Sequence, residues 1–223
     1  MVLTFPWLSA KVNRVKEPAE PASLSSFFRI EILQKGLNNM EINMTTIIHD
    51  DDPRIREHSA DVALPLSDEN RELLSAMHQY VVDSQNPELA QANNLQPAVG
   101  IAAIQLGIPL KMIAVYTGDE EGDISYALVN PRVTMKSRKM AALSGGEGCL
   151  SVPEGHSGLV YRPNKIRVKG YDLLTDQDVV IEAEGYPAIV LQHEIDHLTG
   201  QLYYDHINAM DPMKEIDNGI IIE

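Results

Sequence analysis

The sequence predicts an α+β fold, in which antiparallel or mixed strands pack around one central helix. Segments with a strand-like alternation of apolar and polar residues follow one another between residues 111 and 185, without helices between them. Helical patterns flank this run, one over residues 67–86 and one over residues 187–199. A run of strands with helices before and after it is typical of α+β proteins rather than of alternating parallel units.

The first helix is predicted from a cap, an apolar stripe and a stop signal. Ser67 precedes the pattern as a capping residue. Apolar residues then recur at helical spacing, at Leu73, Leu74, Met77, Tyr80 and Val81. Asn86-Pro87 closes the pattern, because the residue before a proline avoids helical backbone angles.

The middle of the chain contains the predicted strands. KMIAVY (111–116) and YALVNPRVTM (126–135) are rich in β-branched and aromatic residues. Between residues 158 and 185 apolar and polar residues alternate on both sides of LLTDQD. This pattern indicates a strand, a turn and a second strand.

The last helix, PAIVLQHEIDHLTG, begins near Pro187 and ends before Gly200. It carries His193, Glu194 and His197. Residues four apart lie on one face of a helix, so the two imidazoles can bind one cation. Glu194 lies beside the first ligand, within reach of a water molecule on that cation. This central helix is therefore predicted to bind a metal ion.

The third ligand decides the class of metal site. In metzincin proteases a third histidine follows at a fixed distance, but Tyr203 occupies that position and His206 lies three residues too far. Gluzincin proteases use a glutamate on a later helix, yet only 26 residues follow His197. Cys149, the single cysteine, is the better candidate, because thiolate binds Zn²⁺ and Fe²⁺ strongly. A Cys-His-His set leaves a fourth position open, which is typical of catalytic sites.

Composition limits the kinds of partner and compartment. The formal net charge of -14 disfavours a broad nucleic-acid-binding face. A single cysteine cannot form an intramolecular disulfide, and no stretch of 18 or more apolar residues predicts a transmembrane helix. We therefore expect a cytoplasmic protein with no membrane contact. Nothing in the sequence argues for a stable oligomer, so we expect a monomer.

The start of the chain differs from the rest. KEPAEPASLSS has the composition of a linker, and no sustained hydrophobic period appears before Met44. We expect residues 1–43 to form a poorly ordered N-terminal extension. Residues 44–223 are then of ordinary size for one catalytic domain.

Three motifs in order resemble those of the peptide deformylase family. They are AVGIAAIQ (98–105), EGCLS (147–151) and QHEIDHL (192–198). The resemblance spans about residues 44–208, and the long stretch after the second motif looks like the longer, Gram-positive type. It implies the peptide-deformylase-like α+β fold. It also implies removal of the N-formyl group from the initiator methionine of new polypeptides, with release of formate.

The resemblance implies a role for each matched residue. The implied metal ligands are Cys149, His193 and His197. They would hold one divalent ion, typically Fe²⁺, for which Zn²⁺, Ni²⁺ or Co²⁺ can substitute. Glu194 would act first as general base and then as general acid. The side-chain amide of Gln105 and the backbone N–H of Leu150 would stabilise the tetrahedral oxyanion.

Substrate-binding residues also carry over from the resemblance. Backbone groups of Gly100 and Gly148 would pair with an extended N-formylmethionyl peptide. The residues at positions lining the methionine pocket are Val99, Tyr186, Ile189 and Val190. Tyr161 and Arg162 are candidates for the peptide entrance. Nascent polypeptides are the implied partners, and a transient contact with the ribosome is compatible with such a substrate.

One position departs from the family pattern, and two other functions stay open. Ala98 replaces the first glycine of the first motif. If that position requires a positive φ, alanine costs about 1 kcal/mol and shifts the loop. One alternative is another His-Glu-x-x-His metallopeptidase, which would cut unformylated peptides internally. The other is a deformylase-like binding protein with weak catalysis, against which the intact Glu194 and Gln105 count.

Overall fold

The computed structural model describes residues 41–118 and 124–223. The predicted extension, residues 1–43, lies outside the described residues apart from its last three. Of these, Ile42 is buried in the core, so the packed body includes a residue before the predicted boundary at Met44. No helix within the described ranges is long and apolar enough to cross a membrane.

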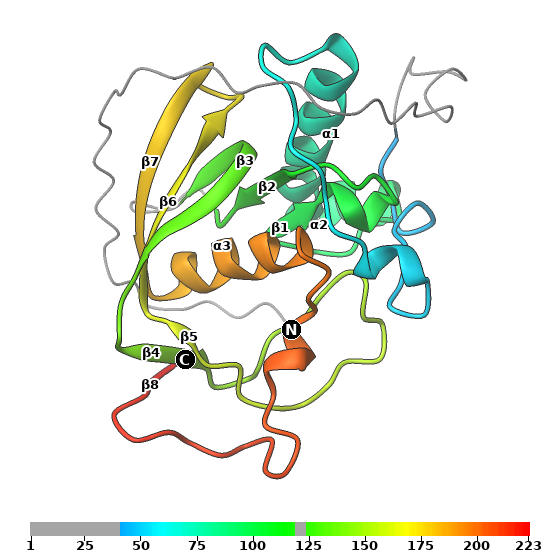
Figure 1. Ribbon diagram of the computed structural model, residues 1–223. Coiled ribbons are helices and arrows are strands. Elements are labelled where there is room, and N and C mark those ends of the chain that lie inside the picture. Colours follow the sequence, from blue (N-terminus) through cyan, green and yellow to red (C-terminus); the bar gives the residue numbers. More distant parts are fainter. Residues whose placement is uncertain (1–40, 119–123) are drawn as a thin grey trace.

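The helices and strands follow the predicted general order, with short elements added between them (Figure 1). The α-helices are α1 (Asp68–Ser84), α2 (Pro87–Ala92) and α3 (Tyr186–His197). The strands are β1 (Gly100–Ala102), β2 (Met112–Tyr116), β3 (Ser125–Lys136), β4 (Met140–Leu143), β5 (Arg162–Pro163), β6 (Lys165–Asp172), β7 (Gln177–Glu184) and β8 (Ile220–Ile222). The 3-10 helices within the described residues are η2 (Pro53–Arg56), η3 (Ala103–Leu106) and η4 (Tyr203–His206).

The strands form two sheets. Five strands make an antiparallel sheet in the order β1-β2-β3-β6-β7. A smaller sheet has the order β5-β4-β8, and its β4–β8 pair is parallel. The antiparallel and mixed strands of the predicted fold class are therefore confirmed. The unpredicted strands β1, β4 and β8 have only three or four residues each, too few for an alternating pattern to be recognised.

The longer strands match the predicted segments with one difference. Strands β6 and β7 flank a turn at residues 173–176, as predicted. The first predicted strand also includes residues 158–164, but this stretch contains only the two-residue β5. Strand β3 continues through Pro131 because its register shifts between Val129 and Arg132. Such an irregularity accommodates a residue that has no N–H to donate to the sheet.

Helix α1 forms where the sequence predicts it. The Ser67 hydroxyl accepts a hydrogen bond from the Asn70 N–H at 3.3 Å, and Asp68 and Glu69 in the first turn favour the positive end of the helix dipole. The predicted apolar residues are all buried: Leu73, Leu74, Met77, Tyr80 and Val81. The Asn86 side chain then caps α2, which separates the two helices.

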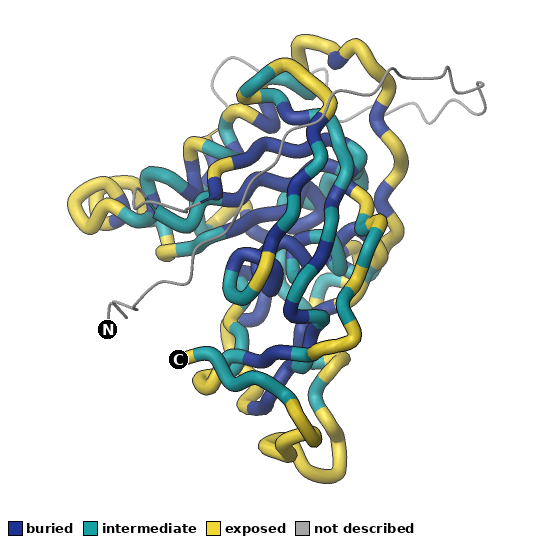
Figure 2. The backbone as a smooth tube through the Cα atoms, turned by 90° about the vertical axis from the view of Figure 1, so that its left-hand side faces the viewer, coloured by how far each residue is buried: buried dark blue, intermediate teal, exposed yellow. Residues whose placement is uncertain are grey.

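The five-stranded sheet lies between α1 on one face and α3 on the other (Figure 1). In β2, Met112 and Ala114 pack in the core that contains α1, whereas Ile113 and Val115 pack in the core that contains α3. Successive residues of a strand point to opposite faces, so one strand supplies both cores. Figure 2 shows the buried interior as dark blue segments, with exposed loops around it. Helix α3 therefore rests on a packed sheet.

Candidate metal site and substrate cavity

The three predicted ligands lie close together. Cys149 follows β4 in a loop, and His193 and His197 are one turn apart on α3. The Cys149 Sγ and one ring nitrogen of each histidine all lie within 4.8 Å of one another. The Sγ is 3.4 Å from His197 Nε2. One sulfur and two imidazole nitrogens are a donor set that suits Zn²⁺ or Fe²⁺.

Glu147 fixes the orientation of His193. Its Oε2 accepts a hydrogen bond from His193 Nδ1 at 2.7 Å, which leaves Nε2 of the ring available. Burial raises the pKa of Glu147, but the hydrogen bonds from His193 and Arg162 together lower it by more than burial raises it. The net shift of the pKa is therefore downward, and the carboxylate is charged. Histidines that bind metals commonly have such a carboxylate on their second nitrogen. The sequence reasoning gave Glu147 no role.

His197 is buried and neutral. Its side chain is 1% exposed, and Nδ1 has no hydrogen-bond partner among the described residues. Burial, and then the neighbouring charge of His193, lower the pKa of His197 well below its ordinary value. A neutral imidazole offers a nitrogen lone pair, and the Nε2 side of this ring faces the thiol. The residues therefore fit a divalent cation.

A chain of polar contacts extends from the buried Glu147 toward partly exposed side chains nearer the surface. Arg162 donates from Nε to Glu147 Oε1 at 2.6 Å and from Nη2 to Oε2 at 3.0 Å. Its Nη1 contacts Asp196 Oδ2 at 2.6 Å, and His206 Nε2 lies 2.8 Å from the same oxygen. The Arg162 side chain is only 5% exposed. Arg162 is therefore not at a peptide entrance, because the paired carboxylates keep it inside the protein.

The buried Glu194 lies on α3, directly after His193. The residue is 4% exposed, and its Oε2 has no hydrogen-bond partner among the described residues. Burial raises its pKa to about 7. Gly100 lies directly against it, since a Cβ added to Gly100 would be 2.3 Å from Glu194 Oε1. Only glycine allows this close approach between β1 and the carboxylate.

Gln105 and Leu150 both lie next to Cys149, Gln105 in space and Leu150 in the chain. Gln105 is on η3 and 1% exposed. Its Oε1 accepts from the Ala102 N–H at 2.8 Å, and its Nε2 lies 3.2 Å from Ser151 Oγ and 3.6 Å from Cys149 Sγ. The Gln105 amide is thereby held with its donor end toward the thiol. Leu150, the next residue after the cysteine, is buried.

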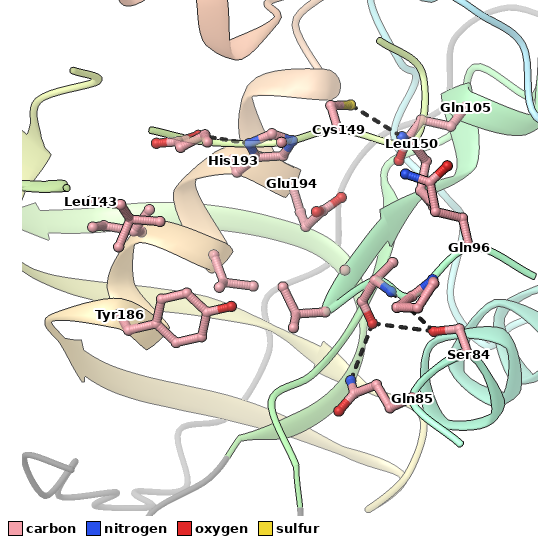
Figure 3. Close-up of a pocket in the computed structure, with 18 of the residues that line it drawn as sticks. Ser84, Gln85, Gln96, Gln105, Leu143, Cys149, Leu150, Tyr186, His193 and Glu194 are labelled. Atoms are coloured by element: carbon pink, nitrogen blue, oxygen red, sulfur yellow. Dashed lines mark hydrogen bonds and ion pairs between the residues drawn. The ribbon is translucent and has the colours of Figure 1, made fainter. Parts of the chain in front are cut away.

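A cavity of about 720 Å³ opens beside these residues. All the predicted substrate residues line it: Val99, Gly100, Gly148, Tyr186, Ile189 and Val190. Figure 3 shows Cys149, His193 and Gln105 at the top of the cavity and Ser84 and Gln85 at the bottom. Lining residues that the sequence did not indicate are Ser84, Gln85, Pro87, Gln96, Pro97 and Leu143. They come from the end of α1, the start of α2, the loop before β1 and the end of β4, and no local pattern places them at the cavity.

Ala98 is not strained. The described residues other than glycine with a positive φ are Asn94, Asn130, Asp176 and Asn218, so Ala98 does not require glycine. The end of α1 holds its backbone instead. The Ser84 hydroxyl accepts from the Ala98 N–H at 3.1 Å, and Gln85 Nε2 donates to the Ala98 carbonyl at 3.1 Å. The condition for the expected loop shift, a positive φ at this position, is therefore not met.

Strand β1 lies at one edge of the five-stranded sheet and beside the cavity. Its residues pair with β2 on one side, with Gly100 opposite Val115. An edge strand has backbone groups on its other side that can pair with a further strand. An extended peptide can therefore add to the sheet at this place.

Comparison with known proteins identifies close relatives. A family model described as polypeptide deformylase matches residues 44–213. "Peptide deformylase 2" of Bacillus subtilis is 46% identical over 183 residues, which are 82% of this chain and 99% of the relative. "Peptide deformylase" of Staphylococcus epidermidis is 42% identical over 181 residues, covering 80% of this chain and 98% of the relative.

Solved structures give the same result. The Ehrlichia chaffeensis peptide deformylase in complex with actinonin matches with a TM-score of 0.59 and 27% identity, covering 74% of this chain and 89% of that one. A class I type b peptide deformylase from Acinetobacter baumannii matches with a TM-score of 0.60 and 28% identity, covering 73% of this chain and 97% of that one.

Proposed function

The chain belongs to the polypeptide deformylase family, and from this premise we propose which of its residues carry out the hydrolysis of N-formylmethionyl peptides. The observation that supports this proposal most strongly is the position of three ligand atoms. Cys149 Sγ and one ring nitrogen each of His193 and His197 lie within 4.8 Å of one another, next to the buried carboxylate of Glu194. Cys149, His193 and His197 hold the catalytic metal ion, and α3 is the metal-binding helix. Fe²⁺ is the proposed native ion, with Zn²⁺, Ni²⁺ or Co²⁺ as substitutes.

A divalent ion bound there supplies Lewis acidity and lowers the pKa of water. Glu194 takes a proton from the attacking water molecule while the oxygen of that water bonds to the formyl carbon. Glu194 then gives a proton to the amine as the carbon–nitrogen bond breaks, so the products are formate and a free amino terminus. The unpaired Oε2 of Glu194 supports this role, because no described side chain competes for the proton.

Gln105 and Leu150 stabilise the oxyanion that develops on the formyl oxygen. The Gln105 amide is fixed through its Oε1, so its Nε2 is oriented before substrate arrives. A fixed donor needs no reorganisation during the reaction, and losing one such donor typically costs about 10²–10³ in rate. The backbone N–H of Leu150 is the second proposed donor.

The cavity holds the substrate in an extended form. Gly100 and Gly148 provide backbone groups that pair with the peptide, as a strand added to the edge at β1. The methionine side chain lies in an apolar pocket formed by Val99, Tyr186, Ile189 and Val190. Partial or full burial of these side chains supports such a pocket.

The proposal also covers the N-terminal extension, the oligomeric state and the location of the enzyme. Residues 1–40 are dispensable for catalysis, since the matched family region begins at residue 44 and the chain before it packs in the core only from Ile42. The enzyme acts as a monomer in the cytoplasm on nascent chains, with transient contact to the ribosome. A variant lacking residues 1–40 that keeps full formate release supports this division, and a large loss of activity overturns it.

The decisive experiment measures formate. Protein purified without oxygen and loaded with Fe²⁺ or Ni²⁺ is incubated with formyl-Met-Ala-Ser. We expect formate release, with no cleavage of the same peptide lacking the formyl group. Internal cleavage of the unformylated peptide would instead favour a peptidase. Absence of formate with one metal ion bound per chain would favour a binding protein and overturn the proposed function.

A further inference from the structure

One short segment near the start of the described chain makes backbone hydrogen bonds to η3, to the loop after β4 and to the end of α3. This segment, residues 48–59, contains η2 and is named the clamp. The Ile48 N–H donates to the Gln105 carbonyl, and the Asp50 N–H donates to the Ser151 carbonyl, each at 2.8 Å. The Ser59 N–H donates to the Leu198 carbonyl at 3.0 Å.

Each of these acceptors is close in sequence to a proposed functional residue. Gln105 is itself the proposed oxyanion donor. Ser151 lies two residues after Cys149, and Leu198 follows His197 directly. The three segments are brought together only by the fold, because they belong to η3, the loop after β4 and the end of α3. The clamp is thus a backbone connection between segments that must stay within a few ångströms of one another.

The clamp is in direct backbone contact with the end of α3. Gly200 has a φ of 70°, and a Cβ added there would lie 2.1 Å from the Arg56 carbonyl oxygen. Ile55, between the two arginines of η2, is fully buried in the same core as Leu198 and Tyr203. In Figure 1 the blue and cyan start of the described chain lies beside the C-terminal end of α3. The clamp therefore packs as part of the core.

Arg56 is the side chain that joins the clamp to the chain after α3. Its Nη1 donates to the Gly200 carbonyl at 3.2 Å and pairs with Asp205. Its Nη2 donates to the Tyr204 hydroxyl at 2.9 Å, and the guanidinium lies 5.2 Å from the centre of the Tyr204 ring. A planar guanidinium can make these contacts together, whereas a lysine ammonium cannot reproduce the fork.

Arg54 provides a natural contrast two residues earlier. Its side chain is 53% exposed, and its ion pair is with Asp52 in the same turn. That pair joins the clamp to itself and not to α3. The two arginines therefore carry the same charge on the same helix, but only Arg56 contacts the chain after α3.

We propose that residues 48–59 position the three segments of the site, two of which carry the metal ligands, and that Arg56 is the positioning residue of this clamp. The proposal rests on the proposed function for the identity of the ligands. Preorganised sites need their surrounding residues to hold ligand geometry within about half an ångström. Removing the link between the clamp and the end of α3 loosens His197 relative to Cys149 and weakens the grip on the ion.

The test compares Arg56→Ala and Arg56→Lys with Arg54→Ala and Arg54→Lys in the full chain. The dissociation constant for Zn²⁺ is measured by competition with a chelator, at a temperature where circular dichroism shows each variant folded. We expect Arg56→Ala to weaken Zn²⁺ binding about 10–100-fold, the range seen for residues that orient metal ligands. Arg56→Lys should be intermediate, and both Arg54 variants should stay within twofold of wild type.

A second measurement separates positioning from general destabilisation. The absorption spectrum of bound Co²⁺ reports ligand geometry, and we expect it to change in Arg56→Ala but not in Arg54→Ala. Wild-type Zn²⁺ affinity and Co²⁺ spectrum in Arg56→Ala, with only a lower melting temperature, would overturn the proposal. So would equal losses in the Arg54 variants. If Arg56→Ala does not fold, wild-type affinity in Arg56→Lys overturns it. Formate release by the wild type tests the proposed function separately.

Discussion

The two helices that cover the five-stranded sheet bury different kinds of residue. Helix α1 buries apolar side chains together with Tyr80 and Ser84. Helix α3 buries apolar side chains together with Gln192, Glu194 and His197. Both helices rest on the same strands, which supply alternate residues to each face. The same sheet thus supports an apolar contact on one side and a titratable site on the other.

The two faces of the sheet differ in how many buried polar groups lack a hydrogen-bond partner. Burying a polar or charged group without a partner costs free energy. On the α3 side the Glu147–Arg162 pair is matched, but Glu194 Oε2 and His197 Nδ1 have no hydrogen-bond partner among the described residues. The α1 side carries no such unpaired group among its described side chains. We infer that the α1 face contributes the stability that offsets the unpaired groups of the site.

The largest expected effect comes from Glu194→Gln. Formate release should fall about 10²–10⁴-fold, because an amide cannot accept the proton of the attacking water. Metal content should be unchanged, and stability to urea should stay the same or rise, since an unpaired buried carboxylate is removed. Steady-state kinetics, metal analysis and urea unfolding check these outcomes. Turnover within tenfold of wild type would refute the role of Glu194 as base.

Arg162→Ala should have the next largest effect. It leaves the buried Glu147 without its arginine partner and with only His193 beside it, and breaking a buried ion pair in this way costs about 3–5 kcal/mol. The control is Arg167→Ala, which removes an ion pair with Glu182 whose arginine side chain is 44% exposed. Exposed pairs contribute much less to stability than buried ones. Similar urea midpoints for the two variants would show that the Glu147 pair is unimportant for folding.

Leu74→Ala tests the α1 face. Leu74 is fully buried, so the substitution should reduce the free energy of unfolding by about 2–5 kcal/mol. The turnover number of the folded, metal-loaded enzyme should remain that of the wild type. A turnover number reduced tenfold in folded protein would show that the two faces are not separable.

Gly100→Ala tests the contact between β1 and Glu194. The new methyl group would lie 2.3 Å from the carboxylate, and overpacking typically costs about 1–3 kcal/mol. Turnover should fall because Glu194 must move. Gly145→Ala is the control, since an added Cβ there has no atom within 4 Å. Equal activity in the two alanine variants would mean that β1 does not fix the carboxylate.

Ala98→Gly should have the smallest effect. Because Ala98 has no positive φ, glycine relieves no strain and only adds freedom to the unfolded chain, which costs up to about 1 kcal/mol. Formate release should stay within twofold of wild type. A severalfold gain in kcat/KM would indicate that alanine does strain this loop.

Local chemistry made much of the site predictable. His193 and His197 lie on one face of a helix because their spacing matches one turn, and no distant residue is needed for that conclusion. The spacing of Ser67, the apolar stripe and Asn86 likewise predicted α1. Cys149 could be proposed as the third ligand because thiolate is a rare and strong donor in this sequence.

The sequence by itself determined the fold class, the two main helices and the donor types of the candidate metal site, because these depend on neighbours a few residues apart. Only the tertiary structure decided which groups surround them. The pairing of Glu147 with Arg162, the approach of Gly100 to Glu194 and the contact of Arg56 with Gly200 join distant parts of the chain. Such contacts leave no periodic pattern, since each depends on how the whole chain packs and not on local backbone geometry.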